Sequence, residues 1–368
     1  MFRLFLIGLI VLVGCGRTTN SRDLIDDDTD PPRSLSRALD TIVQTETRAG
    51  RFMGTVLVAK DGQVVLERGY GHANLARRIP NTANTRYRLG SINKPFTATL
   101  MLTLEDDGLI DIDAPIARYL PDYPEGNRIT VHHLLTHTSG IVNYTELPDF
   151  DAFKADATNL PELIDRFANL PLRFAPGSRF NYSNSNYALL AYIAERVTGN
   201  SYTKVMNDYL LRPLRLPLQV EASRTHISRL ADGYSYDADQ RFVSADDIDV
   251  SVAMGSGNIV GTARDLYAWD RALARGNITR AAQTKLFTPY TTVDFLPGVR
   301  YGYGWMLRNS PYGREQAHTG SIDGFRSYFA RYPNQDTVII VLANVETDVI
   351  SLGQRLAEAT FSRRARSN

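Results

Sequence analysis

The chain has 368 residues, of which 43% are hydrophobic and 22% are charged, and its net charge is +1. This is the composition of a globular protein, and the length is sufficient for a large core and two lobes. A net charge so close to zero gives no reason to expect nucleic acid as a partner.

The first 14 residues have the pattern of a signal peptide. Arg3 supplies a positive charge, and the apolar run over residues 4–13 is too short to span a bilayer comfortably. The run leads into Leu-Val-Gly-Cys at residues 12–15, which resembles the lipobox of bacterial lipoproteins. That resemblance implies cleavage before Cys15, the only cysteine, and lipid attachment to it. The lipid would hold the protein at a membrane of the bacterial cell envelope, facing the periplasm or the exterior. The alternative is an ordinary signal peptide beside a bystander cysteine.

Residues 15–34 are expected to form a lipidated, flexible tether, because they are polar, carry an acidic run at 26–28 and end in a Pro-Pro pair. The folded domain is expected over residues 35–362, followed by a basic tail at 363–368. It begins with an amphipathic helix over about 34–50. A hairpin follows, with strands at 54–60 and 63–71 and an Asp61-Gly62 turn.

The distribution of the remaining elements predicts an α+β fold. Residues 100–250 read mostly as helix and loop, including a helix over 187–197. Strands are expected at 301–308, 316–319, 324–332 and 337–344, and a helix at 348–362. Strands at both ends of the chain predict one antiparallel sheet flanked by helices, with a sheet lobe of about 35–98 and 255–362. A mostly helical lobe of about 99–254 is inserted, and a cleft is expected between the lobes.

Ser91 and Lys94 are the first candidates for chemistry. They begin a predicted helix that is apolar nearly all round and ends at Gly108, and Pro95 fits only its first turn. The three-residue spacing puts a hydroxyl and an amine on one face, at the positive end of the helix. A serine nucleophile needs both a nearby base and such a field. The alternative is that Ser91 only caps the helix.

The Ser-x-x-Lys pattern occurs a second time, at Ser201 and Lys204. Here Ser201 follows the end of a helix at Gly199 and is expected to be a helix cap. Lys204 is expected on the polar side of the next short helix.

The Tyr-Ser-Asn sequence at residues 182–184 lies in a turn-rich stretch just before a helix. A tyrosine near a lysine ammonium is expected to be pushed toward phenolate, and can then exchange protons with a serine and a leaving group. The amide of Asn184 can donate to a substrate carbonyl and accept from a lysine. The alternative is a surface turn in which Tyr182 only packs.

The third candidate is His318-Thr319-Gly320, on a predicted strand. Gly320 leaves room for close approach of a ligand, and backbone N–H groups of this strand and of Ser91 can form an oxyanion hole. The alternative is that His318 is a core histidine.

Together these three motifs resemble the serine β-lactamase and penicillin-binding-protein superfamily, in its class C branch. The order Ser-x-x-Lys, Tyr-x-Asn, His/Lys-Thr-Gly matches. Four flanking segments match as well: HLLTHTSG at 133–140, PGSRFNYSNSNYALL at 176–190, GSGNIVGTARDL at 255–266 and YGYGW at 301–305.

The resemblance implies a serine hydrolase that works through an acyl-enzyme. Ser91 would be the nucleophile, Lys94 and Tyr182 would share the acid and base work, and Asn184 would orient the substrate. His318 and Thr319 would line the substrate side, next to Gly320, and the N–H groups of Ser91 and Ser321 would form the oxyanion hole.

The resemblance also bears on the substrate. Class C β-lactamases carry lysine, a fixed cation suited to a substrate carboxylate, where this chain has His318. A histidine there is familiar from D-alanyl-D-alanine carboxypeptidases and esterases. We therefore expect ester or D-amino-acid peptide substrates, small or derived from peptidoglycan, and place a true β-lactamase and a penicillin-recognising sensor module second. No cofactor or metal is expected, since His133 and His137, four residues apart, lack the context of a zinc site.

Overall fold

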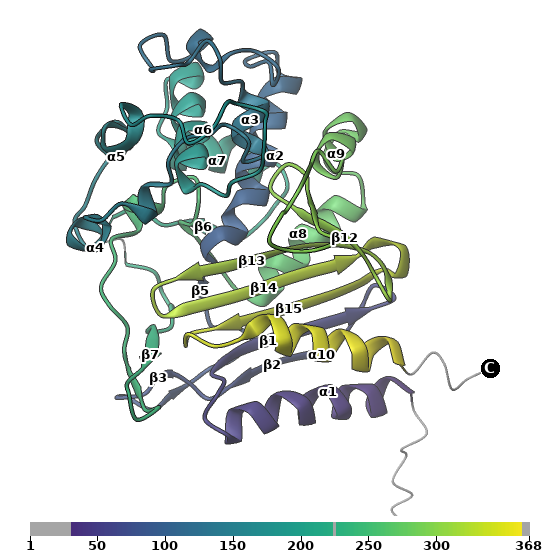
Figure 1. Ribbon diagram of the computed structural model, residues 1–368. Coiled ribbons are helices and arrows are strands. Elements are labelled where there is room, and N and C mark those ends of the chain that lie inside the picture. The colour runs from purple at the N-terminus through teal and green to yellow at the C-terminus, as the bar shows by residue number, and fades with distance from the viewer. Residues whose placement is uncertain (1–30, 224–225, 363–368) are drawn as a thin grey trace, which may run out of the picture.

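The computed structural model describes residues 31–223 and 226–362. The predicted signal peptide, Cys15, most of the predicted tether and the basic tail lie outside these ranges. The described part forms a mixed fold in which a large sheet separates a pair of terminal helices from a mostly helical lobe (Figure 1). The α+β class predicted from the sequence is confirmed.

The large sheet is antiparallel at every pairing and is built from both ends of the chain. Its strands in spatial order are β10 (Thr291–Thr292), β11 (Arg300–Tyr301), β12 (Met306–Ser310), β13 (Gly313–Ile322), β14 (Phe325–Tyr332), β15 (Thr337–Ala343), β1 (Gly54–Lys60) and β2 (Gln63–Tyr70). The predicted β1–β2 hairpin is present, and both residues of its Asp61-Gly62 turn have positive φ, as this tight turn requires.

Two helices, α1 (Pro31–Arg48) and α10 (Val349–Ser362), cover one face of the sheet (Figure 1). Leu35, Leu39 and Val43 of α1 share a core with Val56 and alternate residues of the central strands. The first helix begins at Pro31, so the last residues assigned to the tether belong to it. Proline is well tolerated in a first helical turn, where its missing N–H leaves no bond unmade.

The other face of the sheet carries the main core, which includes Leu57, Phe329, Ile340 and Leu342 of the sheet. The helices on this side are α2 (Asn93–Asp106), α3 (Val131–Leu135), α4 (Phe150–Phe153), α5 (Leu160–Ala168), α6 (Asn184–Thr198), α7 (Tyr202–Met206), α8 (Ala263–Ala274) and α9 (Arg280–Leu286). Short strands complete the fold: β3 (His72–Asn74), β4 (Ile79–Pro80), β5 (Tyr87–Arg88), β6 (Gln219–Val220), β7 (Tyr234–Tyr236), β8 (Phe242–Ser244) and β9 (Ile259–Gly261).

The single strand predicted over residues 301–308 was wrong, because β11 ends at Tyr301 and β12 starts at Met306. Gly304, in the turn between them, has φ +75° and lies against the start of α2. A Cβ there would come within 2.8 Å of the Lys94 carbonyl oxygen. The turn therefore packs against the backbone that carries Lys94, and only glycine fits at its tip.

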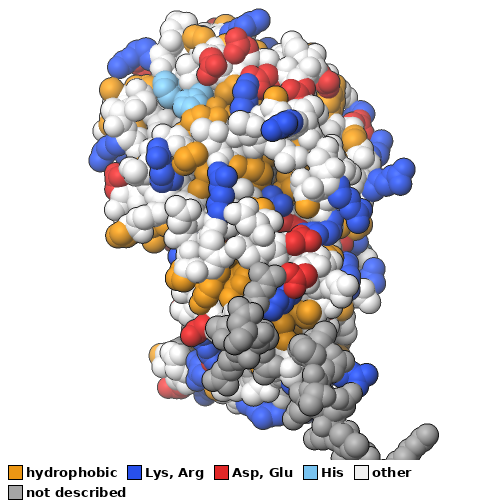
Figure 2. Space-filling model, turned by 90° about the vertical axis from the view of Figure 1, so that its right-hand side faces the viewer, with side chains coloured by type: hydrophobic (Ala, Val, Ile, Leu, Met, Phe, Trp, Pro, Cys, Tyr) orange, Lys and Arg blue, Asp and Glu red, His pale blue; other side chains and the backbone are white. Residues whose placement is uncertain are grey.

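One face of the molecule carries side chains of both signs (Figure 2). On the face shown in Figure 2, basic and acidic groups alternate with hydrophobic ones and do not gather into one continuous patch of either sign. No helix within residues 31–223 and 226–362 is both long enough and apolar enough to cross a membrane.

Candidate active site

Ser91 lies in a short 3-10 turn (η1, Gly90–Ile92) that leads directly into α2, and Lys94 lies in the first turn of α2. Helix α2 is buried on nearly all sides, as its apolar sequence predicts, and the Lys94 side chain is 0% exposed. Gly90 has φ +54°, and a Cβ there would lie 2.8 Å from the backbone nitrogen of Ser321. The glycine thus lets the Ser91 turn touch strand β13.

The Lys94 amine is held by three oxygens. Its Nζ lies 2.9 Å from Ser91 Oγ, 2.8 Å from Asn184 Oδ1 and 3.1 Å from the Ser256 carbonyl oxygen. Burial holds the pKa of Lys94 well below its usual value, which favours the neutral amine. A neutral amine has two N–H donors and one lone pair. Since the Asn184 and Ser256 oxygens only accept, the lone pair is left for the Ser91 hydroxyl proton.

Tyr182 borders the same amine from the loop that precedes α6. Lys94 Nζ lies 4.8 Å from the centroid of its ring. Burial raises the pKa of Tyr182, and a hydrogen bond with Ser91 offsets only part of this. The phenol is therefore protonated at neutral pH, opposite to the tendency toward phenolate expected from the sequence. Its O–H is a proton donor beside the Ser91 hydroxyl.

Asn184 links the loop that carries Tyr182 to the segment of Asn143 and Thr145. Its Oδ1 accepts from Lys94, and its Nδ2 donates to Thr145 Oγ1 at 3.2 Å. Its backbone N–H donates to Asn143 Oδ1 at 3.0 Å. The side chain is thus fixed at both ends, with its oxygen turned to the amine.

His137 lies near the site, although the sequence did not identify it as a site residue. Its ring lies 4.3 Å from that of Tyr182, centroid to centroid, and its Nδ1 accepts from the Ser183 N–H at 3.1 Å. It therefore holds the Tyr182 loop in place. The two residues are 45 positions apart in the chain, and no spacing rule connects them.

The edge of β13 forms another wall. Strand β12 pairs with β13 only as far as Ala317, so residues 318–322 face the Ser91 turn instead. Gly320 lies against this turn, where a Cβ would come within 1.9 Å of the Leu89 carbonyl oxygen. The backbones of Ser91 and Ser321 therefore border one space, in which their N–H groups can hold a developing oxyanion.

His318 lies behind this edge and does not line the cavity, although the resemblance placed it on the substrate side. It is 1% exposed, with Nδ1 2.7 Å from the Thr319 carbonyl oxygen and Nε2 3.1 Å from the Tyr301 hydroxyl. Burial lowers the pKa of His318 to about 3. The ring is neutral, and both of its nitrogens are satisfied within the protein. Thr319 is half-buried beside it and does not line the cavity either.

The cavity above Ser91 has a volume of about 380 Å³ and opens between the helical lobe and the end of β13. Ser91, Tyr182, Asn184 and Ser321 meet in it. The other lining residues are Gly90, Asn143, Tyr144, Thr145, Phe150, Ile248, Val252, Ala253, Ser256, Gly257, Ile322 and Asp323.

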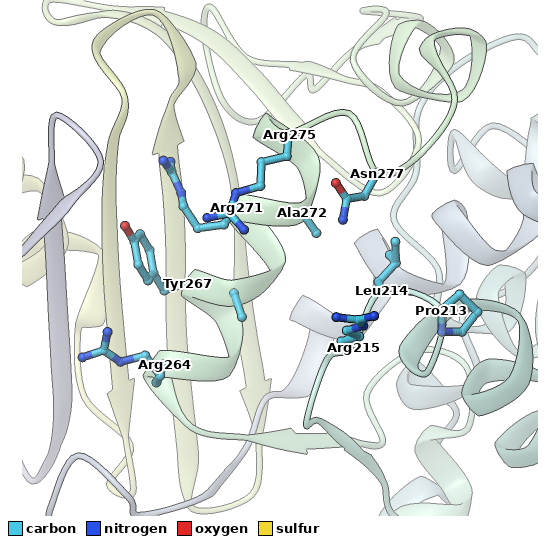
Figure 3. A pocket seen from close by; sticks show the side chains of 10 residues that line it. Pro213, Leu214, Arg215, Arg264, Tyr267, Arg271, Ala272, Arg275 and Asn277 are labelled. Atoms are coloured by element: carbon cyan, nitrogen blue, oxygen red, sulfur yellow. The ribbon is translucent and has the colours of Figure 1, made fainter.

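A second hollow lies between α8 and the segment that follows α7 (Figure 3). Its lining is Pro213, Leu214, Arg215, Arg264, Tyr267, Ala268, Arg271, Ala272, Arg275 and Asn277. Arg264 is paired with Glu67, and Arg271 with Asp270 and Asp336. The hollow contains neither a serine nor a lysine, so it lacks the groups for acyl transfer.

The second Ser-x-x-Lys pair is a helix cap. Ser201 Oγ accepts from the Lys204 backbone N–H at 3.4 Å, and the Lys204 ammonium pairs with Asp208 on the surface. No cluster of three or more His, Cys, Asp or Glu side chains suited to a metal ion occurs in the described residues.

Comparison with known proteins agrees with this geometry. The chain matches the Beta-lactamase family over residues 39–360. It is 30% identical over 332 residues to penicillin-binding protein 4* of Bacillus subtilis, covering 84% of this chain and 72% of that protein.

Similar solved structures include a penicillin binding protein and an amidohydrolase. A penicillin binding protein from Bacillus halodurans is 27% identical, with a TM-score of 0.76 and coverage of 88% of this chain and 99% of that one. A D-stereospecific amidohydrolase from Streptomyces sp. is 29% identical, with a TM-score of 0.73 and coverage of 89% and 98%. The chain therefore belongs to the Beta-lactamase family and is a serine hydrolase of the β-lactamase and transpeptidase type.

Proposed function

We propose that this protein hydrolyses esters or D-amino-acid amides and peptides of the cell-wall type through an acyl-enzyme on Ser91, as an esterase or DD-peptidase of the class C branch. The observation that carries the proposal is the buried Lys94 amine, 2.9 Å from Ser91 Oγ and shifted toward its neutral form. A base in this state can accept the serine proton at neutral pH.

The first half of the reaction forms the acyl-enzyme. Lys94 Nζ takes the proton of Ser91 Oγ as the oxygen attacks the substrate carbonyl carbon. The N–H groups of Ser91 and Ser321 hold the negative charge that develops on the carbonyl oxygen. As the tetrahedral intermediate collapses, the Tyr182 hydroxyl gives its proton to the departing oxygen or nitrogen, and the Lys94 ammonium returns a proton to Tyr182.

In the second half, water replaces the leaving group and the steps run in reverse. Tyr182 takes a proton from the water as the water oxygen attacks the acyl carbon, and passes its own hydroxyl proton to the neutral Lys94 amine. Ser91 leaves with a proton supplied by Lys94. Because Lys94 and Tyr182 exchange a proton with each other, the apparent pKa values seen in a titration describe the pair and not either residue alone.

Covalent labelling with a fluorophosphonate and a fluorescent penicillin tests the nucleophile. Ser91→Ala is expected to abolish labelling, whereas Ser201→Ala, in the second Ser-x-x-Lys pair, is expected to label like the wild type. Equal labelling of wild type and Ser91→Ala removes the basis of the proposal.

Steady-state turnover separates the alternative activities. A p-nitrophenyl ester, a peptide ending in D-alanyl-D-alanine and nitrocefin are compared on one preparation. Faster turnover of nitrocefin than of the ester and the peptide identifies a true β-lactamase. Stable labelling without turnover of any of the three identifies a sensor module.

We also propose that Cys15 carries a lipid that holds the domain at the cell envelope. The support is the lipobox-like sequence at residues 12–15. Detergent extraction after expression in a bacterial host tests this, since Cys15→Ala is expected to move the protein to the soluble fraction. Retention of Cys15→Ala in the membrane fraction excludes this anchor.

A further inference from the structure

The charge of the candidate active-site cavity is one-sided. Of the residues that line it in the described part of the chain, Asp323 is the only carboxylic acid, and none is Lys, Arg or His. Lys94 is buried behind the residues that line the cavity, and its amine contacts three oxygens. His318 is buried and neutral. A substrate carboxylate entering this cavity meets no cation and one anion.

Asp323 is held in a fixed position. It follows β13 directly, in a two-residue turn with Gly324 that joins Ile322 to Phe325 of β14. The Gly324 N–H donates to Glu346 Oε1 at 3.1 Å. Gly324 also packs against Gly233, since a Cβ on Gly324 would lie 2.5 Å from the Gly233 Cα. The carboxylate is thus presented two residues beyond Ser321, on the wall that carries the oxyanion donors.

Lys154 does not neutralise this end of the cavity. Its Nζ lies 3.1 Å from Asp323 Oδ2, 3.2 Å from Asp151 Oδ1 and 3.3 Å from Asp246 Oδ2. One ammonium against three carboxylates leaves a net charge of −2 on this group. Among the described residues the ion pair of Asp323 engages Oδ2 alone, and the side chain is 29% exposed, so Oδ1 is available to a ligand.

The cavity that Asp323 lines also has apolar lining residues. Phe150, Ile248, Val252 and Ile322 border the same cavity. An ammonium that binds Asp323 loses bound water and gains a carboxylate partner. In a partly desolvated cavity this charge-assisted hydrogen bond is stronger than on the open surface. A substrate carboxylate bound at the same place is destabilised both by desolvation and by repulsion from Asp323.

We infer that the cavity selects acyl donors that carry a positively charged amine close to the reacting carbonyl, such as amides and esters of amino acids with a free α-amino group, and that Asp323 receives this ammonium. The inference rests on the proposed function, because it takes Ser91 as the attacking group. It narrows the substrate class to cationic acyl groups and disfavours acyl groups that place a carboxylate at this end.

Two p-nitroanilides that differ only in the amino group test the inference. They are the anilides of D-phenylalanine and of 3-phenylpropionic acid, assayed at pH 6.5, where the α-amine is mostly protonated. For each enzyme variant we take the ratio of kcat/KM for the D-phenylalanine anilide to kcat/KM for the 3-phenylpropionic acid anilide. Comparing this ratio between variants cancels the intrinsic reactivity of the two substrates.

Asp323→Asn is expected to lower this ratio about tenfold, mainly through KM of the charged substrate, as for the loss of one charge-assisted hydrogen bond. Asp246→Asn is the matched control: it removes another carboxylate from Lys154, but its side chain is 83% exposed and does not line the cavity. Its ratio is expected to stay within twofold of the wild type.

An unchanged ratio in Asp323→Asn, or an equal fall in Asp246→Asn, overturns the inference. Hydrolysis of p-nitrophenyl acetate that depends on Ser91 reports the proposed function separately and shows that each variant has a folded site. If that hydrolysis persists in Ser91→Ala, the proposed function fails. If it depends on Ser91 while the ratio does not change, only the substrate inference fails.

Discussion

Replacing Lys94 by methionine tests the chemical core of the site. Methionine keeps the unbranched stem in the buried position and removes the group that takes the Ser91 proton. Loss of a general base costs about 10²–10⁴ in rate, which is about 3–5 kcal/mol of transition-state stabilisation. Tyr182 cannot substitute for the amine, because burial raises its pKa and keeps it protonated. We therefore expect kcat/KM for a p-nitrophenyl ester to fall by at least 10².

The same variant has a cost in stability that must be measured beside its activity. The Asn184 Oδ1 and Ser256 carbonyl oxygens lose their amine donor. A buried acceptor left unsatisfied costs about 1–3 kcal/mol, and removal of the desolvated amine offsets part of this. Urea unfolding is expected to show a loss of about 1–3 kcal/mol, small enough for the variant to stay folded at 25 °C.

The pH profile of the wild type gives an independent reading of Lys94. The amine must be unprotonated to act as base, so kcat/KM is expected to rise with pH through the pKa of Lys94. Since burial lowers that pKa, the midpoint is expected well below 10.5. A midpoint at or above 10.5, or a folded Lys94→Met within tenfold of wild-type activity, refutes Lys94 as the base.

Three further changes test the surroundings of the serine. Tyr182→Phe keeps the ring contact with His137 but removes the proton donor, so kcat is expected to fall about 10²-fold while the thermal midpoint changes little. His318 has a folded pKa of about 3 against 6.5, so its stabilising contribution is present above pH 6.5 and is lost as pH falls toward 3. The free energy of unfolding in urea is therefore expected to fall between pH 7 and pH 4 by about 3 kcal/mol less in His318→Gln than in the wild type. Equal falls in the two proteins contradict a buried, neutral His318 ring. Gly320→Ala drives a Cβ to within 1.9 Å of the Leu89 carbonyl oxygen, so loss of fluorophosphonate labelling is expected, and wild-type labelling excludes the close packing of strand and turn.

Patterns that are local in sequence predicted the parts of the fold that local physics decides. The Asp61-Gly62 pair predicts a tight turn because both residues tolerate positive φ, and the structure has both there. The apolar positions from Phe96 to Leu104 predict a buried helix, and α2 is buried. The Ser91–Lys94 contact follows from helix geometry alone, since residues three apart share a face.

Features that depend on tertiary packing were not predictable in this way. The break between β11 and β12 follows from the contact of Gly304 with the Lys94 backbone, which joins residues 210 positions apart. The protonation of Tyr182 depends on its burial, and burial follows from the whole fold. The contact between His137 and Tyr182 depends on how two loops meet.

His318 shows why a matching motif does not fix the role of each residue in it. The sequence places an imidazole at the position where class C β-lactamases have a lysine, but its orientation depends on partners elsewhere. In this chain the Tyr301 hydroxyl and the Thr319 carbonyl satisfy both ring nitrogens inside the protein. The position therefore supplies no charge to the cavity at neutral pH. The charge that the cavity does present, at Asp323, is of the opposite sign. Binding of a carboxylate-bearing β-lactam would thus require an anion to approach an anion, whereas an ammonium gains a partner at the same place.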